Sequence, residues 1–68
     1  MEPIIDYERG GYGFTEFENN YGRGVEVYEI DNNGTPHLVA EVAGKGVDDI
    51  EDMTEKEFGF FLAENNIL

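Results

Sequence analysis

The sequence predicts an α+β domain in which an antiparallel meander sheet of three or four strands carries one C-terminal helix on one face. Three observations lead to this fold class. Segments rich in Val, Ile, Leu and Tyr alternate with turn residues over the first two thirds of the chain, as in consecutive antiparallel strands. The apolar spacing changes to a helical period after position 54. The chain has 68 residues, which is room for a single small domain spanning 1–68.

The central hairpin is predicted by residues 24–31 (GVEVYEID) and 37–43 (HLVAEVA), which NNGTP separates. A two-residue type I′ turn at Asn33 and Gly34 would fix their register. One face then carries mostly apolar cross-strand pairs: Val25–Val42, Val27–Ala40 and Glu29–Leu38. The opposite face carries a mixed set: Glu26–Glu41, Tyr28–Val39 and Ile30–His37. Pro36 has no N–H, so it is tolerated there mainly at a sheet edge or ladder end.

The strands before this hairpin are also predicted from apolar segments that turn residues separate. Residues 12–18 form a strand that ENNYGRG joins to the hairpin, because Asn and Gly supply the backbone conformations of a turn. Residues 4–7 are a candidate for a short additional strand. The sheet therefore has three or four strands.

The C-terminal helix is predicted from Thr54 onward. Thr54 and Glu57 have the spacing of a capping box, and acids crowd the first turn, where the helix dipole favours them. The stripe expected to cover the apolar face of the hairpin consists of Phe58, Phe61 and Leu62, with Ala63 beside them. Phe60 points away from this stripe. The preceding segment, GKGVDDIEDM, repeats an apolar residue at every third position and can hold a short helical turn.

Net charge restricts the partners. The chain has 16 Asp and Glu against 4 Lys and Arg, a formal charge of −12, which repels nucleic acid and anionic membranes and attracts basic protein surfaces. It has no cysteine, which favours a reducing compartment. The N-terminal segment is acidic and no apolar run reaches the ~18 residues of a membrane span, so we expect a cytoplasmic protein without a signal peptide.

A short motif raises nucleic-acid binding as the alternative function. In RGGYGFTEF the glycines and rings have the spacing of the ribonucleoprotein motif, and the segment resembles the RNA-recognition family over these residues: Gly11, Tyr12, Gly13, Phe14 and Phe17. Only a dozen residues precede it, too few for the strand, helix and strand that come first in that family. The chain is also similar to a cold-shock domain in its length and in the place of this strand, which implies a small barrel that binds single-stranded nucleic acid.

Two features argue against both resemblances. The chain ends in a predicted helix and lacks the second aromatic strand of a cold-shock domain. Stacked bases also need a basic groove, to which only Arg9 and Arg23 could contribute here. We therefore expect Tyr12, Phe14 and Phe17 to pack in or beside the core.

Enzymatic chemistry has few candidate residues. There is no Cys or Ser nucleophile, and His37 has no triad partner. Glu26 and Glu41 resemble a catalytic carboxylate pair by position, but two solvated acids are the expected interpretation. The DNNG at 31–34 lacks the later glycine and glutamate of a calcium loop and is expected to be a turn. We expect a non-enzymatic protein without cofactor or metal.

Acidic residues on the connection and the helix start are the main candidate binding site. Six carboxylates fall within ten residues: Asp48, Asp49, Glu51, Asp52, Glu55 and Glu57. Such an array can imitate a row of phosphates. The chain is similar in size, acidity and sheet-plus-helix content to small phage and mobile-element proteins that inhibit DNA-binding enzymes by this imitation, although it shares no specific motif with them. The alternative is a solubilising surface on an orphan structural domain.

A second candidate interface is apolar. Tyr28, Ile30 and Val39 are expected on the sheet face that has no helix to cover it, and exposed apolar patches usually mark interfaces. The core of so small a domain supplies only about 3–5 kcal/mol, which also favours association. We therefore expect self-association or partner docking there, and a protein-binding role overall.

Overall fold

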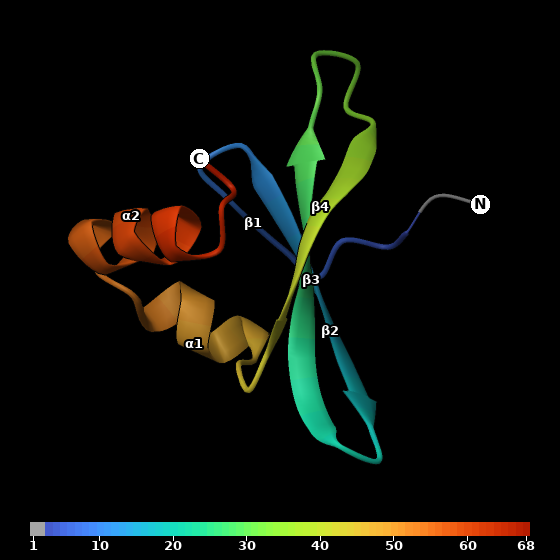
Figure 1. Cartoon of the computed structure of the whole chain (residues 1–68). Coiled ribbons are helices and arrows are strands. Elements are labelled where there is room, and N and C mark those ends of the chain that lie inside the picture. The colour runs from blue at the N-terminus through green and yellow to red at the C-terminus, as the bar shows by residue number, and fades with distance from the viewer. Residues whose placement is uncertain (1–2) are drawn as a thin grey trace.

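The computed structural model describes residues 3–68, and within them a four-stranded antiparallel sheet carries two helices on one face (Figure 1). Met1 and Glu2, part of the acidic N-terminal segment, lie outside the described residues. The strands are adjacent in chain order, so the sheet is an open meander. The elements are β1 (Tyr7–Arg9), β2 (Tyr12–Asn19), β3 (Gly22–Ile30), β4 (Pro36–Ala43), α1 (Val47–Asp52) and α2 (Glu55–Glu64). The predicted fold class is confirmed, and α1 is the short helical turn expected in the acidic connection.

The first strand begins at Tyr7, not at Ile4, so the prediction of a strand over residues 4–7 is wrong in its bounds. The cause is the turn that follows. Gly10 and Gly11 have φ values of 60° and 85°, the positive values that both central residues of a type I′ turn require. This two-residue turn pairs the three residues before it with the three after it, from Arg9–Tyr12 to Tyr7–Phe14.

The connection between β3 and β4 is longer than the predicted type I′ turn at Asn33 and Gly34. Asp31 N–H donates to Thr35 O at 3.0 Å, so three residues lie between the closing pair. Within residues 3–68, Asn66 is the one non-glycine residue with positive φ, so Asn33 lacks the conformation that type I′ needs. The Asp31 carboxylate stabilises the longer loop instead, because it accepts the backbone N–H groups of Asn33 and Thr35, each at 2.9 Å.

A β-bulge at Val39 makes the longer loop compatible with the predicted register of the core valines. Nearest the helices the register is as predicted, with Val25 opposite Val42, Glu26 opposite Glu41 and Val27 opposite Ala40. Beyond the irregularity at Val27/Tyr28 the predicted pairs are wrong, and the observed ones are Tyr28–Leu38, Glu29–His37 and Ile30–Pro36. The three-residue loop shifts the strand register by one residue. Because Val39 is left unpaired in β4, the shift ends at the bulge, and the core valines keep facing the helices. Pro36 is the first residue of an edge strand, as expected.

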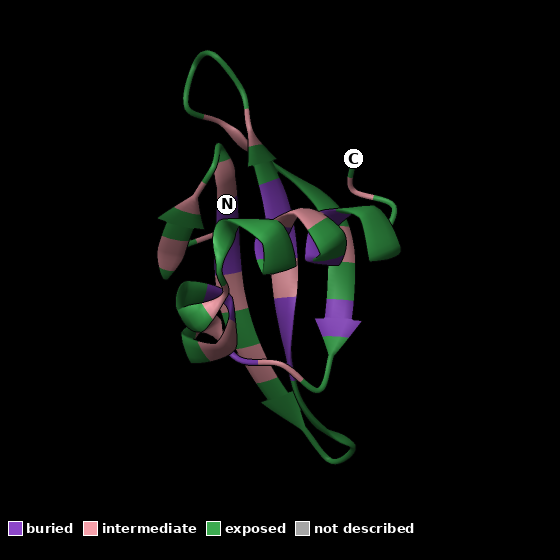
Figure 2. Cartoon of the chain, turned by 90° about the vertical axis from the view of Figure 1, so that its left-hand side faces the viewer, coloured by how far each residue is buried: buried purple, intermediate pink, exposed green. Residues whose placement is uncertain are grey.

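The core lies between the sheet and the helices (Figure 2). Its buried side chains come from both layers: Phe14, Val25, Val27, Val42, Ile50, Phe58, Phe61 and Leu62. The Phe14 ring centroid lies 6.2 Å from that of Phe58 and 6.4 Å from that of Phe61. The predicted α2 stripe is therefore confirmed, except that Ala63 is exposed because the turn of the helix carries it past the sheet.

Gly11 and Gly59 provide a test of the Gly10–Gly11 turn. A Cβ at either position meets nothing within 4 Å, so the two sites differ mainly in backbone conformation. We expect Gly11→Ala to lower the free energy of unfolding by about 1–2 kcal/mol, since its φ is left-handed. We expect Gly59→Ala to raise it by about 1 kcal/mol, since Gly59 lies inside α2. Urea denaturation measures both values, and stabilisation by Gly11→Ala would contradict the turn.

Candidate functional site

The six predicted carboxylates all lie on the helix layer, four on α1 and two on α2. We call them the acidic helix surface: Asp48, Asp49, Glu51, Asp52, Glu55 and Glu57. The structure brings them onto two consecutive short helices joined by Met53 and Thr54. Their individual contacts separate those that stabilise the fold from those that are available to a partner.

Asp48 and Asp49 attach the start of α1 to β3 through Arg23. The guanidinium of Arg23 lies 3.7 Å from Asp48 Oδ1 and 3.4 Å from Asp49 Oδ2. Asp49 Oδ2 also accepts the backbone N–H of Gly46 at 2.8 Å, at the N-terminus of the helix. All three side chains remain partly exposed, so solvent weakens the two ion pairs. These two carboxylates therefore have a structural role as well as a surface position.

Arg9 connects β1 to both helices. Its guanidinium donates a 2.7 Å hydrogen bond to the carbonyl of Ile50, which is in α1. It lies 4.5 Å above the centre of the Phe58 ring, which is in α2. The third contact is an ion pair with Glu55 at 3.3 Å. The Arg9 side chain is only 15% exposed whereas that of Glu55 is 95% exposed, so the ion pair is the weakest of the three contacts.

Glu57 forms the predicted capping box with Thr54. Its Oε1 accepts the Thr54 backbone N–H at 2.8 Å, and its own N–H donates to Thr54 Oγ1 at 3.1 Å. The backbone hydrogen bond from Thr54, and then the contact with the Thr54 side chain, hold the pKa of Glu57 below its ordinary value. The carboxylate is therefore ionised and fixed in place at the start of α2.

Glu51 and Asp52 make no ion pair with any of residues 3–68, and their side chains are exposed. Lys45 and Lys56 also lack an ion-pair partner in this range, whereas both arginines have one. The arginines are thus committed to holding the helices on the sheet. Glu51, Asp52 and the outer side of Glu55 are the carboxylates most available to a partner.

Tyr28, Ile30 and Val39 do not form the exposed apolar patch that the sequence predicts. Tyr28 is only 9% exposed, and its hydroxyl donates to Glu26 Oε1 at 3.1 Å. Burial, followed by this contact with Glu26, raises the pKa of Tyr28. Ile30 is half-buried, and only Val39 is exposed. The bulge places Leu38 rather than Val39 opposite Tyr28.

Residues 3–6 lie on the sheet face opposite the helices (Figure 1). The side chains of Ile5 and Ile30 both pack where Gly13 leaves room, since a Cβ there would lie 2.9 Å from Ile5 and 3.2 Å from Ile30. This segment, rather than a second helix, covers part of that face.

The rings of RGGYGFTEF are not displayed for stacking on bases. Phe14 is fully buried in the core, and Tyr12 packs against it. Phe17 is half-buried and lies against Gly24. The two arginines that could hold a nucleic-acid backbone are engaged with carboxylates. The expectation that these rings pack in or beside the core is confirmed, and the sheet is open rather than a closed barrel.

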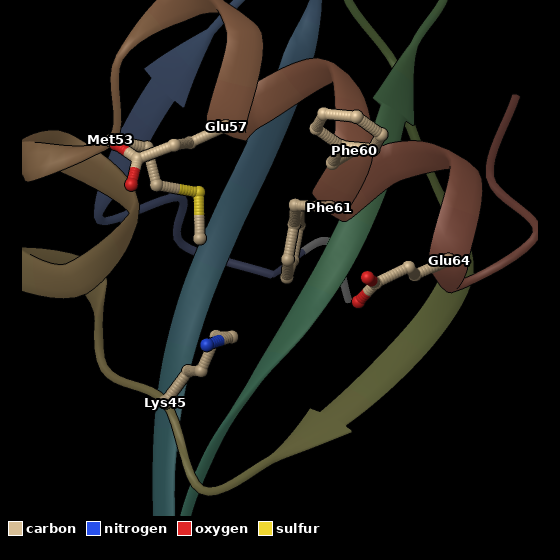
Figure 3. Close-up of a pocket in the computed structure, with 6 residues that line it drawn as sticks. All are labelled: Lys45, Met53, Glu57, Phe60, Phe61 and Glu64. Atoms are coloured by element: carbon tan, nitrogen blue, oxygen red, sulfur yellow. The ribbon is translucent and has the colours of Figure 1, made fainter.

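Sequence reasoning missed a hollow of about 440 Å³ beside α2 (Figure 3). It is lined by Lys45, Met53, Glu57, Phe60, Phe61 and Glu64. Four of these residues belong to α2 and follow the spacing i, i+3, i+4 and i+7, which defines one helix face. That spacing is visible in the sequence, where Phe60 lies outside the predicted buried stripe.

The chain matches no protein-family model, no curated protein and no solved structure. Neither helix of residues 3–68 is long and apolar enough to cross a membrane. Within the same residues, no three His, Asp or Glu side chains gather in a way that could hold a metal ion.

Replacing Arg9 tests how the helices are attached to the sheet. Arg9→Met keeps the aliphatic stem but removes the donors to Ile50 O and the charge above Phe58. We expect it to lower the free energy of unfolding by about 2–3 kcal/mol, the usual value for a charge-assisted hydrogen bond plus a cation–π contact. Glu55→Gln is the matched control and should cost less than about 0.5 kcal/mol, because its ion pair is exposed. Equal losses in urea denaturation would contradict this ranking.

The capping box predicts a pH dependence that involves Glu57. Its pKa is lowered in the folded protein from the ordinary 4.5, so its stabilising effect is complete above that pH. The effect is lost as the pH falls through the folded pKa. Carboxyl NMR titration should place the midpoint of Glu57 below 4.5. Thr54→Val removes the hydroxyl and should raise that midpoint, and a midpoint at or above 4.5 in the unmodified protein would contradict the capping box.

Proposed function

We propose that this chain is a small acidic, non-enzymatic protein-binding module that engages a basic surface of another protein through the acidic helix surface. The observation that carries the proposal is the use of both arginines inside the fold, at Ile50, Phe58 and the start of α1. The exposed carboxylates Glu51 and Asp52 are left without cationic neighbours in ion-pair contact among residues 3–68. A partner can supply those cations.

Electrostatics sets the character of such binding. A formal charge of −12 on 68 residues speeds the encounter with a cationic surface and slows the approach to polyanions. Exposed ion pairs are screened by salt, with a Debye length of about 8 Å at physiological ionic strength. Affinity should therefore fall steeply as salt is added.

Imitation of nucleic acid is the sharper form of this proposal. An inhibitor of a DNA-binding protein, of the kind phages and mobile elements encode, would place its carboxylates where the target binds phosphates. The exposed carboxylates on two short consecutive helices support this form, and the lack of cysteine supports action in the cytoplasm. DNA should then compete with the chain for the same partner.

Charge reversal tests the proposal. A tagged chain should capture basic proteins from cells that encode it, and salt should release them. We expect Glu51→Lys/Asp52→Lys to reduce this capture at least tenfold, because the reversed charges repel a basic partner. The control is Glu8→Lys/Glu41→Lys, which has the same net charge but places the changes on the edge strands β1 and β4.

Two results would contradict the proposal. If the control loses as much capture as the helix variant, total charge rather than the acidic helix surface is responsible. If a single-stranded oligonucleotide binds tightly at physiological salt, the alternative of a nucleic-acid-binding domain is favoured instead.

A further inference from the structure

Helix α2 has a second face besides the one that packs on the sheet. Phe58, Phe61 and Leu62 are buried in the core, whereas Phe60 is 60% exposed. On this second face Glu57 and Glu64 lie one turn before and one turn after the pair Phe60 and Phe61. The exposed Phe60 ring therefore lies between two carboxylates on this face.

The space in front of this face is the 440 Å³ hollow. Figure 3 shows Phe61 pointing into it, Met53 and Glu57 on one side, Glu64 on the other, and the Lys45 side chain rising toward Phe61 from the β4–α1 connection. Phe61 is only 4% exposed, so the floor of the hollow is part of the rigid core. Phe60 forms an apolar lip that solvent reaches.

We propose that this hollow receives an apolar side chain from a basic segment of a partner protein, whose two flanking cationic side chains pair with Glu57 and Glu64. The inference rests on the proposed function and gives the acidic module a specific contact. The hollow has the size for one or two large apolar side chains rather than for a folded domain.

Charge complementarity identifies the occupant. Glu57 and Glu64 are seven residues apart in α2, which separates them by about 10 Å at 1.5 Å rise per residue. Lysines seven residues apart in a partner helix have the same separation, and leucines between them would face Phe60. The capping box keeps Glu57 ionised and fixed, so one of the two charges is already positioned for binding.

Lys45 disfavours binding of this basic segment, so replacing Lys45 tests the proposal. Its ammonium group carries the same sign as the partner and makes no ion pair with residues 3–68, and its side chain lines the hollow. It therefore repels a cationic side chain that enters the hollow. Lys45→Met keeps an unbranched apolar side chain and removes the charge, so binding should become tighter. If Lys45→Met damaged the fold, binding would instead become weaker.

The experiment uses two synthetic helical peptides of equal charge. Both carry two lysines seven residues apart. One has leucines at the third and fourth positions after the first lysine, and the other has alanines there. In calorimetric titration at physiological salt, we expect the leucine peptide to bind the unmodified chain at least tenfold more tightly than the alanine peptide.

Three variants locate the contact. Phe60→Ala should remove the preference for the leucine peptide and leave the alanine peptide unaffected. Lys45→Met should tighten both peptides severalfold. Tyr21→Ala is the matched control, because Tyr21 is 99% exposed at the β2–β3 turn, far from α2 in Figure 1, and should change neither affinity.

The outcomes separate this inference from the proposed function. Equal binding of the two peptides to the unmodified chain overturns the hollow as a binding site and leaves the acidic module standing. Binding of neither peptide also overturns the inference, whereas the capture experiment with Glu51→Lys/Asp52→Lys decides the proposed function. A dimer in sedimentation that Phe60→Ala dissociates would mean that a second copy, not a basic partner, occupies the hollow, and would overturn the inference.

Discussion

The arrangement of the two helices on the sheet depends on the contacts of the Arg9 side chain. Helix α1 has only six residues and α2 has ten, and helices this short are unstable alone in water. The packing of Ile50, Phe58, Phe61 and Leu62 supplies most of their stability. Apolar packing is not directional, whereas the Arg9 guanidinium fixes α1 through a carbonyl and α2 through a ring. One residue of a three-residue edge strand thereby sets the relative position of both helices and the sheet.

The use of arginine inside the fold explains how a chain with so few cations can be both folded and strongly acidic outside. Arg9 and Arg23 each act where the helix layer meets the sheet. Asp48 and Asp49 are partly neutralised there, so they contribute less to the outward field than their number suggests. Glu51 and Asp52 contribute fully. A count of carboxylates in the sequence therefore overstates the site, and the contacts divide it into a structural part and an available part.

Residue patterns predict most of this fold and little of the site. Periodicity identifies the strands, the capping box identifies α2, and the β3–β4 register near Val25 follows from the alternation of apolar residues. The loop could not be predicted from Asn33-Gly34, because the Asp31 carboxylate stabilises a longer turn that competes with type I′. The bulge at Val39 then follows from the loop, and with it the pairing of Tyr28 with Leu38. Gly10-Gly11 carries the same signal for a type I′ turn, although it lies inside a motif whose spacing resembles that of nucleic-acid-binding families.

Charge and shape have separate roles in the helix layer. Carboxylates attract any cationic surface, so they set the rate of encounter and the salt dependence but discriminate little among basic proteins. Discrimination requires a contact that a wrong partner cannot make, and in known interfaces buried apolar anchors usually supply it. Among the residues of α1 and α2, Phe60 is the exposed large apolar side chain, and it borders a hollow whose floor is Phe61. Because Phe61 is also a core residue, the shape of that hollow is maintained by the same packing that holds α2 on the sheet.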